Sequence, residues 1–182
     1  FKPPLSLERL RSATALLFAE RAFPDQLTPR REIGLMLHGH FAAPGNALSY
    51  SRGSLAKAFF NYHLGVFNGE GDRGGFNEGD SNDNKEIIAR LFAHPFRASG
   101  IDPLEGLGIG IAGSYANPSN LSINNLRTPG QATLLRYDDG VTSDGTHYRI
   151  YPQAYWYWGP FGAMAEWVLS SQRLKNAAGN ED

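Results

Sequence analysis

The sequence contains no cysteine among its 182 residues, so neither disulfide bonds nor thiolate metal sites are available to it. It has no apolar run near the roughly 18–20 residues that a membrane-spanning helix requires, which excludes a helical membrane protein. The net charge is −1 and 19% of the residues are charged, a balance that predicts no nucleic-acid partner. No nucleotide-binding, serine-hydrolase or zinc-protease motif is present. We therefore expect neither an enzyme nor a bound cofactor or metal ion.

A signal peptide is also missing, because the opening FKPPLSLERL has no basic stretch followed by an apolar one. The final residues, NAAGNED, do not form a closing strand. From these two features we expect the 182 residues to be an internal fragment of a longer protein.

Charge is unevenly distributed along the chain. Residues 1–57 contain eight Lys or Arg and four Asp or Glu, whereas acids gather in residues 69–86 and 137–145. The stretch DSNDNKE at 80–86 partly resembles a calcium-binding loop, but it lacks the central glycine and the full ligand spacing. An acidic, solvated loop is the better interpretation of this stretch.

Period-two alternation dominates the rest of the sequence. Residues 5–23 are the exception, since their apolar side chains recur at helical spacing behind Ser6 as a candidate cap. The alternating segments are each about ten residues long, which is typical of membrane β-strands. They cover residues 31–41, 58–67, 85–96, 104–115, 146–158 and 161–171. Pro152 lies inside the fifth segment and predicts a β-bulge, because proline cannot donate to the ladder.

The connections between these strands alternate in length. Residues 68–84 and 116–146 are long, and residues 97–105 and the Gly159-Pro160 pair are short, as in outer-membrane barrels. This pattern requires residues 131–137 to belong to a long external connection. Aromatic side chains flank the Gly-Pro turn and predict an aromatic girdle at one membrane interface, formed by Trp156, Trp158 and Phe161. A soluble β-sandwich also has regularly spaced alternating strands and remains an open alternative.

Several stretches resemble the bacterial outer-membrane phosphate-selective porins of the O and P type. They are FKPPLSLERL, IGLMLHG at 33–39, LGVFNG at 64–69, ARLFAHPF at 89–96, LGIGIAGSYAN at 107–117, RTPGQATLLRY at 127–137 and residues 140–172. The resemblance implies an all-β fold, an antiparallel transmembrane β-barrel of about sixteen strands, with about six in this chain. Residues 1–182 would be one partial barrel domain, with an external or constriction-loop segment and short helix over 1–30 and barrel strands over 31–172. The segment 42–62 is longer than the corresponding turn of the family.

The resemblance also implies a function, a water-filled channel for small anions such as phosphate or polyphosphate. Such a channel would be a homotrimer in the bacterial outer membrane, in contact with lipid and lipopolysaccharide. Basic residues lining a lumen favour anions, and arginine binds phosphate through paired hydrogen bonds. The candidate residues for the anion path are Lys2, Arg9, Arg11, Arg21, Arg90 and Arg149. The histidines expected on the polar wall are His38, His40, His63 and His94.

Two alternatives to this function stay open. The basic side chains of the first segment are equally typical of a solvated helix face, and inward-facing arginines often only pair with acids. A porin-like barrel would also serve as an envelope scaffold whose external loops bind a partner.

Overall fold

The computed structural model describes residues 2–12, 14, 16, 20–42, 58–69, 84–123, 125–128 and 132–176. Most of the predicted acidic loop at 68–84, most of the calcium-like stretch at 80–86 and the long connection at 43–57 lie outside these residues. The fold is all-β and antiparallel, with few and short helices, as predicted. Within the described part of the chain, no helix has the length and apolarity needed to cross a membrane.

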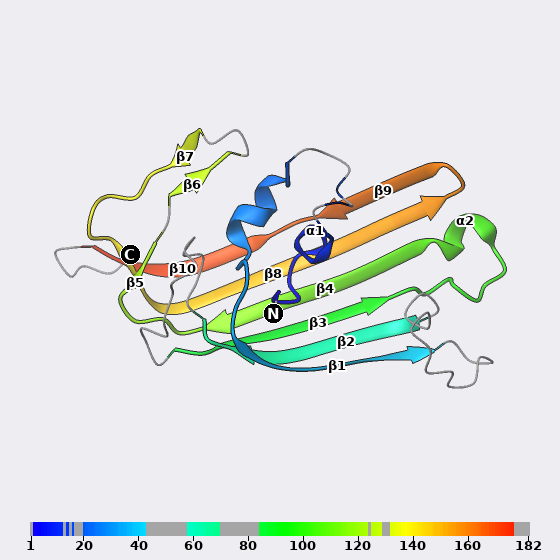
Figure 1. Ribbon diagram of the computed structural model, residues 1–182, viewed down its shortest axis with the longest axis horizontal. Helices are drawn as coiled ribbons and strands as arrows, with labels where there is room; N and C mark the ends of the chain where they lie inside the picture. Colours follow the sequence, from blue (N-terminus) through cyan, green and yellow to red (C-terminus); the bar gives the residue numbers. More distant parts are fainter. Residues whose placement is uncertain are drawn as a thin grey trace.

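One open, twisted sheet forms the body of the molecule (Figure 1). Its strands follow the order β1-β2-β3-β4-β8-β10, and β9 extends the β10 side of β8. Their bounds are β1 Gly34–Ala42, β2 Ala58–Phe67, β3 Glu86–Ala93, β4 Leu107–Ala116, β8 Thr142–Trp158, β9 Phe161–Glu166 and β10 Leu169–Lys175. All six predicted strands are therefore present, and the sixth is divided into β9 and β10. Among the described residues the sheet does not close into a barrel.

The smaller elements lie in the connections. The helix α2 (Asp102–Glu105) joins β3 to β4, and β5 (Leu121–Ser122) pairs with β8. Strands β6 (Leu126–Arg127) and β7 (Thr133–Leu135) form a separate two-stranded sheet. The described residues of the stretch 131–137, which are 132–137, thus lie outside the main sheet, as the predicted alternation of loops requires.

The bulge predicted at Pro152 is wrong. Strand β8 passes through Pro152 in constant register with β4, where Pro152 is opposite Ile111. The break occurs instead in the neighbouring strand, between Glu166 and Leu169. Trp167 donates its N–H to the Pro152 carbonyl at 3.0 Å, but Pro152 has no N–H to return the bond. The ladder therefore loses one hydrogen bond and divides β9 from β10 without a change of register.

The two faces of the sheet differ in an unusual way. Large apolar side chains, each at least 39% exposed, fill one face, which we call the open face. They include Leu35, Leu37, Leu64, Val66, Ile87, Leu91, Ile109, Ile111, Tyr115, Tyr148, Ile150, Trp158, Phe161 and Leu169. Most side chains at the centre of the opposite, covered face are buried, and many of them are polar. Its members include Phe67, Ile88, Arg90, Phe92, Ala112, Ser114, His147, Arg149, Tyr151 and Gln153.

The described residues between 2 and 31, which we call the N-terminal segment, lie across the covered face (Figure 1). Leu5 is fully buried there against Phe67, Ile88, Ala112 and Tyr151. Side chains of β8 fasten the segment, because Gln153 Nε2 donates to the Leu5 carbonyl at 2.7 Å and the Tyr151 hydroxyl donates to the Leu27 carbonyl at 2.9 Å. The hydrophobic core is thus made by this segment and the covered face.

The helix predicted over 5–23 is wrong in extent. Among the described residues of this stretch only Leu7–Leu10 (α1) is α-helical, and Phe23–Leu27 (η2) is a 3₁₀ turn; residues 13, 15 and 17–19 lie outside the described part. Ser6 caps α1 as expected, since its hydroxyl accepts from the Arg9 N–H at 3.1 Å. The helix stops at Arg11, whose backbone is extended. Lys2 Nζ donates hydrogen bonds to the carbonyl oxygens of Arg9 and Arg11, at 2.9 and 3.1 Å. In a longer helix these carbonyls would accept from backbone N–H groups of the next turn.

Candidate functional site

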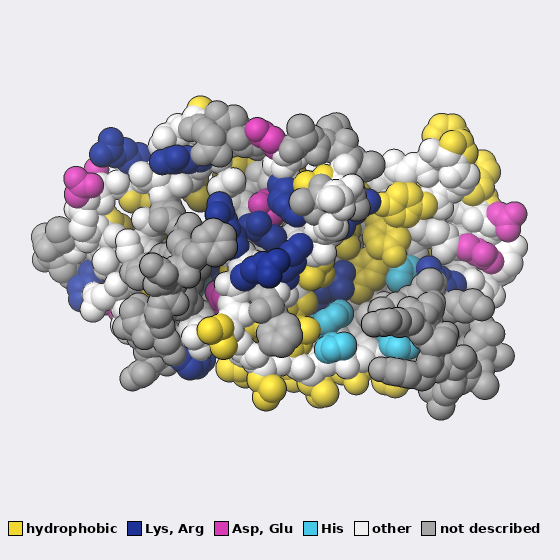
Figure 2. All heavy atoms as spheres, viewed as in Figure 1, with side chains coloured by type: hydrophobic (Ala, Val, Ile, Leu, Met, Phe, Trp, Pro, Cys, Tyr) yellow, Lys and Arg dark blue, Asp and Glu magenta, His cyan; other side chains and the backbone are white. Residues whose placement is uncertain are grey.

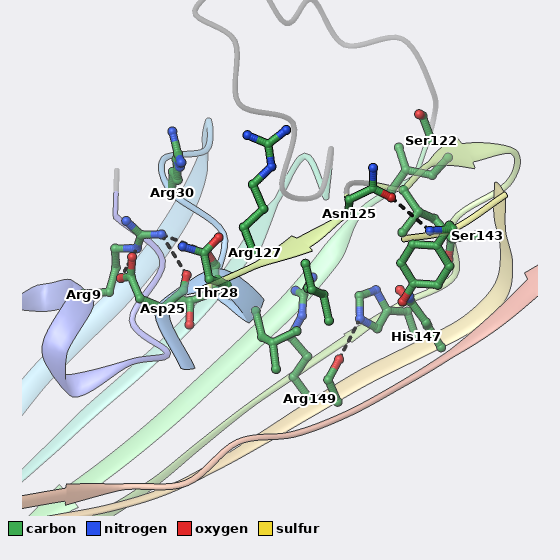
Figure 3. A pocket seen from close by; sticks show the side chains of 18 residues that line it. Arg9, Asp25, Thr28, Arg30, Ser122, Asn125, Arg127, Ser143, His147 and Arg149 are labelled. Atoms are coloured by element: carbon green, nitrogen blue, oxygen red, sulfur yellow. Dashed lines mark hydrogen bonds and ion pairs between the residues drawn. The ribbon is translucent and has the colours of Figure 1, made fainter. Parts of the chain in front are cut away.

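A cavity of about 420 Å³ separates the N-terminal segment from the end of the covered face where the long connections lie (Figure 3). Residues near η2, the β5–β6 segment, β8 and β10 contribute to its wall. Four arginines line the cavity, and the one acid among its described lining residues is Asp25. These arginines are Arg9, Arg30, Arg127 and Arg149. The cavity therefore has an excess of positive charge.

Asp25 contacts two of the predicted basic residues, Arg9 and Arg21. Arg9 Nε lies 3.0 Å and Arg21 Nε 3.9 Å from Asp25 Oδ1. Arg9 also donates to the carbonyls of Asp25 and Thr28, at 3.0 and 3.2 Å, and Arg21 donates to the Glu8 carbonyl. Burial raises the pKa of Asp25 above its ordinary value, although Arg9 and Arg21 act in the opposite direction. These contacts shape the N-terminal segment, and they leave Arg9 at the edge of the cavity.

The other two predicted residues of this segment lie outside the cavity lining. Lys2 is turned back on α1, and burial together with the charge of Arg21 lowers the pKa of its ammonium group. Arg11 is half-buried and its guanidinium contacts Met164 Sδ at 3.8 Å. Both residues act in the packing of the segment against itself or against β9.

The two predicted strand arginines face the covered side, as the alternation indicated. Arg149 NH1 forms a buried ion pair with Glu86 Oε1 at 2.9 Å and also lines the cavity. Arg90 donates from Nε and NH2 to Gln153 Oε1, at 3.1 and 3.0 Å, and lies 4.7 Å above the Phe92 ring. Of the two, only Arg149 joins the cavity.

Three cavity residues were missed by sequence reasoning. Arg30 and Arg127 come from segments far apart in sequence and extend away from the sheet, whereas His147 and Arg149 lie on it (Figure 3). Within the described ranges, neither Arg30 nor Arg127 forms an ion pair. His147 Nε2 lies 3.4 Å from Ser170 Oγ. The charge excess of residues 1–57 pointed to Arg30, but no local pattern singled out Arg127 or His147.

The four predicted histidines lie away from this cavity. The rings of His38 and His63 stack at 5.9 Å, and His94 Nε2 lies 2.5 Å from the Tyr155 hydroxyl. His40 is half-buried near the end of β1. These histidines therefore lie on the covered face, toward the ends of the strands that are farther from the cavity.

The predicted aromatic girdle residues lie together at the β8–β9 turn. The rings of Trp156 and Trp158 are 6.2 Å apart, and Phe161 pairs with Trp158 across the turn. Trp158 and Phe161 are exposed on the open face, while Trp156 Nε1 donates to the Pro103 carbonyl. A second group continues this band at the same end of β1 and β2, where Phe41 contacts Phe60 and Tyr62.

Among the described residues, no group of three or more His, Cys, Asp or Glu is placed to hold a metal ion. Comparison of the chain with protein-family models, with curated proteins and with solved structures found no match.

Proposed function

We propose that this chain is part of an outer-membrane porin that lets small anions, phosphate in particular, diffuse through a water-filled lumen. The observation that carries the proposal is the exposed, apolar open face opposite a buried, charged covered face. A sheet built for water hides its apolar side chains, whereas a membrane strand turns them toward lipid.

The dimensions of the open face support the proposal. Tyr115 and Tyr148 are paired near one end of the sheet, and Trp158 ends β8 at the other. The eleven residues from Tyr148 to Trp158 span ~34 Å along the strand, or ~26 Å across a membrane at a tilt of ~40°. That is about the height of the apolar band of outer-membrane barrels, with aromatic residues at both borders.

The lengths of the connections also support the proposal and indicate which end of the sheet would face outward. The connection between β4 and β8 begins after Ala116 and ends at Thr142, at the end of the sheet that holds the cavity, and the two-residue turn 159–160 lies at the other end. Long external loops and short periplasmic turns are the usual arrangement. The basic cavity would then lie on the external side, where solutes enter.

The lumen itself would require further strands. Among the described residues no strand pairs with the outer edge of β1 or of β10, and lipid does not tolerate an open sheet edge. We propose that these edges pair with further strands of a longer protein, giving a barrel of about sixteen strands and a homotrimer, as the resemblance implies. The outer-membrane lipid, including lipopolysaccharide, would contact the open face.

A second candidate function is an envelope scaffold. The N-terminal segment covers much of the inner wall, and Leu5 is fully buried beneath it. A lumen filled in this way would conduct poorly, and its external loops would be the functional surface.

The deciding experiment is the reversal potential of the full-length protein in a planar bilayer under a potassium chloride gradient and then a phosphate gradient. Anion-selective current that falls in the Arg30→Ala/Arg127→Ala variant would support the porin. The control is Arg136→Ala, which removes an exposed arginine outside the cavity lining. Cation selectivity would contradict the anion assignment, and absence of current from inserted protein would favour the scaffold.

A further inference from the structure

A row of aromatic rings crosses the covered face at the end opposite the cavity. Phe92 on β3 and Tyr155 on β8 are stacked, with centroids 5.3 Å apart and an angle of 22° between the planes. Tyr157 continues the row at 5.4 Å from Tyr155, with its plane turned by 49°. Figure 2 shows hydrophobic side chains gathered on this face to the right of the central basic side chains. We call Phe92, Tyr155 and Tyr157 the ring shelf.

Glycines of the neighbouring strands hold these rings flat against the sheet. A Cβ on Gly108 would lie 2.7 Å from Phe92 Cε1 and 2.9 Å from Tyr155 Cζ. A Cβ on Gly162 would lie 2.8 Å from Tyr157 Cε1. Since no real Cβ approaches so closely, the rings occupy the space of the missing side chains. A ring that lies flat on the backbone turns its other face away from the sheet.

The accessible part of the shelf lies on β8. Phe92 is only 3% exposed, because the Arg90 guanidinium covers it, whereas Tyr157 is 44% exposed and Tyr155 is half-buried. Tyr155 and Tyr157 therefore offer ring faces for stacking. The Tyr155 hydroxyl is already engaged with His94, so hydrogen-bonding capacity at this point is reduced.

Positive charge flanks the shelf on two sides. Arg90 lies over Phe92 at one end. On the other side Arg11 contacts Met164, which pairs with Tyr155 across the β8–β9 ladder. A solute that stacks on the tyrosines would have a guanidinium group within reach of an anionic substituent.

From this geometry we infer that the ring shelf binds anionic solutes that carry an aromatic ring, such as aryl phosphates or aryl carboxylates. An apolar ring suits the shelf better than a sugar, because the shelf presents π faces and few free polar groups. The site differs from the basic cavity in position and in the ligand feature that it recognises. It rests on the proposed function only in that the covered face must be open to solutes.

The test is isothermal titration calorimetry of the detergent-solubilised full-length protein with phenyl phosphate and with methyl phosphate, which has the same charge but no ring. We expect phenyl phosphate to bind about three- to tenfold more tightly, the usual effect of one aromatic pair. Tyr157→Ala should remove this difference, Tyr157→Phe should retain it, and Arg11→Ala should weaken both probes. The control Tyr148→Ala removes a tyrosine from the open face and should change neither affinity.

Equal affinity of the two probes for the unmodified protein would overturn the inference. So would an unchanged preference in Tyr157→Ala, or tighter binding of glucose 6-phosphate than of phenyl phosphate, which would identify a sugar site. Because binding is measured without conduction, a protein that conducts but does not discriminate refutes the shelf alone. A protein that binds phenyl phosphate but passes no current refutes only the channel.

Discussion

Arg149 on β8 and Glu86 on β3 form an ion pair across the intervening strand β4, with 2.9 Å between NH1 and Oε1 and side chains only 4% and 3% exposed. Ser114 of β4 pairs with Arg149 on one side and, on the other, with Ile88, two residues from Glu86 along β3. The pair therefore ties three strands together on the covered face.

Replacing Glu86 by glutamine should destabilise the protein by about 3–5 kcal/mol, because the buried charge of Arg149 loses its counter-ion. Urea unfolding of the refolded protein in micelles measures this change. The control is Asp144→Asn, since Asp144 and Lys175 form a more exposed pair at 3.4 Å that should contribute about 0–1 kcal/mol. Equal small losses in both variants would contradict the importance of burial.

A charge placed on the open face tests what that face contacts. Ile111 lies near the middle of β4 and is 50% exposed, so Ile111→Arg should cost about 2–4 kcal/mol if lipid covers it. Tyr115→Arg, nearer the membrane border, should cost about 0–1 kcal/mol. The free energy of folding into lipid vesicles gives both values. If the face contacted water, both substitutions would stay within about 0.5 kcal/mol.

Glu166 attaches α1 to the sheet. Its Oε2 accepts from the N–H groups of Leu7 and Glu8, at 2.7 and 3.3 Å. Glu166→Ala should therefore release the start of α1, at a cost of about 1–2 kcal/mol. Faster hydrogen exchange at the Leu7 and Glu8 amides would report this release, and Glu20→Ala, an exposed acid of the same segment, should leave them protected. Unchanged exchange in Glu166→Ala would show that packing of Leu5 suffices.

Asp25 should give the protein a particular pH dependence. Burial raises its folded-state pKa above the ordinary 3.8, so ionised Asp25 reduces stability at neutral pH. As the pH falls through the raised pKa toward 3.8, the folded state takes up the proton first and this residue's contribution to stability rises. Asp25→Asn should lack that rise when unfolding free energies are compared between pH 7 and 4. Identical pH profiles for the two proteins would refute the raised pKa.

Gly110 should be intolerant of a side chain. A Cβ there would collide with the Phe92 ring and lie 2.7 Å from the Leu91 carbonyl, so Gly110→Ala should cost about 1–3 kcal/mol. Gly113→Ala is the matched control on the same strand, because its nearest contact is the Arg149 carbonyl at 3.2 Å. Adding Phe92→Leu should recover part of the loss in Gly110→Ala. If the double variant were as unstable as Gly110→Ala alone, the loss of stability would come from the contact with the backbone and not from the contact with the Phe92 ring.

Period-two alternation in the sequence was enough to predict the strands and the faces of Arg90, Arg149 and Ile111, because alternation assigns each residue to a side of a sheet. It did not predict that Arg149 meets Glu86, since cross-strand partners depend on register, and register depends on connections of unknown path. The predicted extent of the first helix was wrong for a related reason. The side chain of Lys2 and the packing of Leu5 decide where the helix ends, and helical spacing contains neither contact.

The residues that meet at the cavity also could not be predicted from the sequence pattern. Arg30 and Arg127 meet because the N-terminal segment and the β5–β7 connection fold onto one end of the covered face. Neither residue lies on a strand face of the main sheet where alternation would apply. Arginines in loops therefore looked alike in the sequence, although the fold places only some of them at the cavity.

The order of strands in the main sheet also has a consequence for assembly. Each of β1 to β3 pairs with the next strand along the chain, and β4 pairs with β8 after the long connection that carries β5 to β7. A sheet with this order can assemble strand by strand along the chain. At each stage the strand added last is the edge with which the next strand pairs. In the proposed membrane barrel a bare edge would be costly in lipid, so the order of strands along the chain would also be the order in which they enter the bilayer.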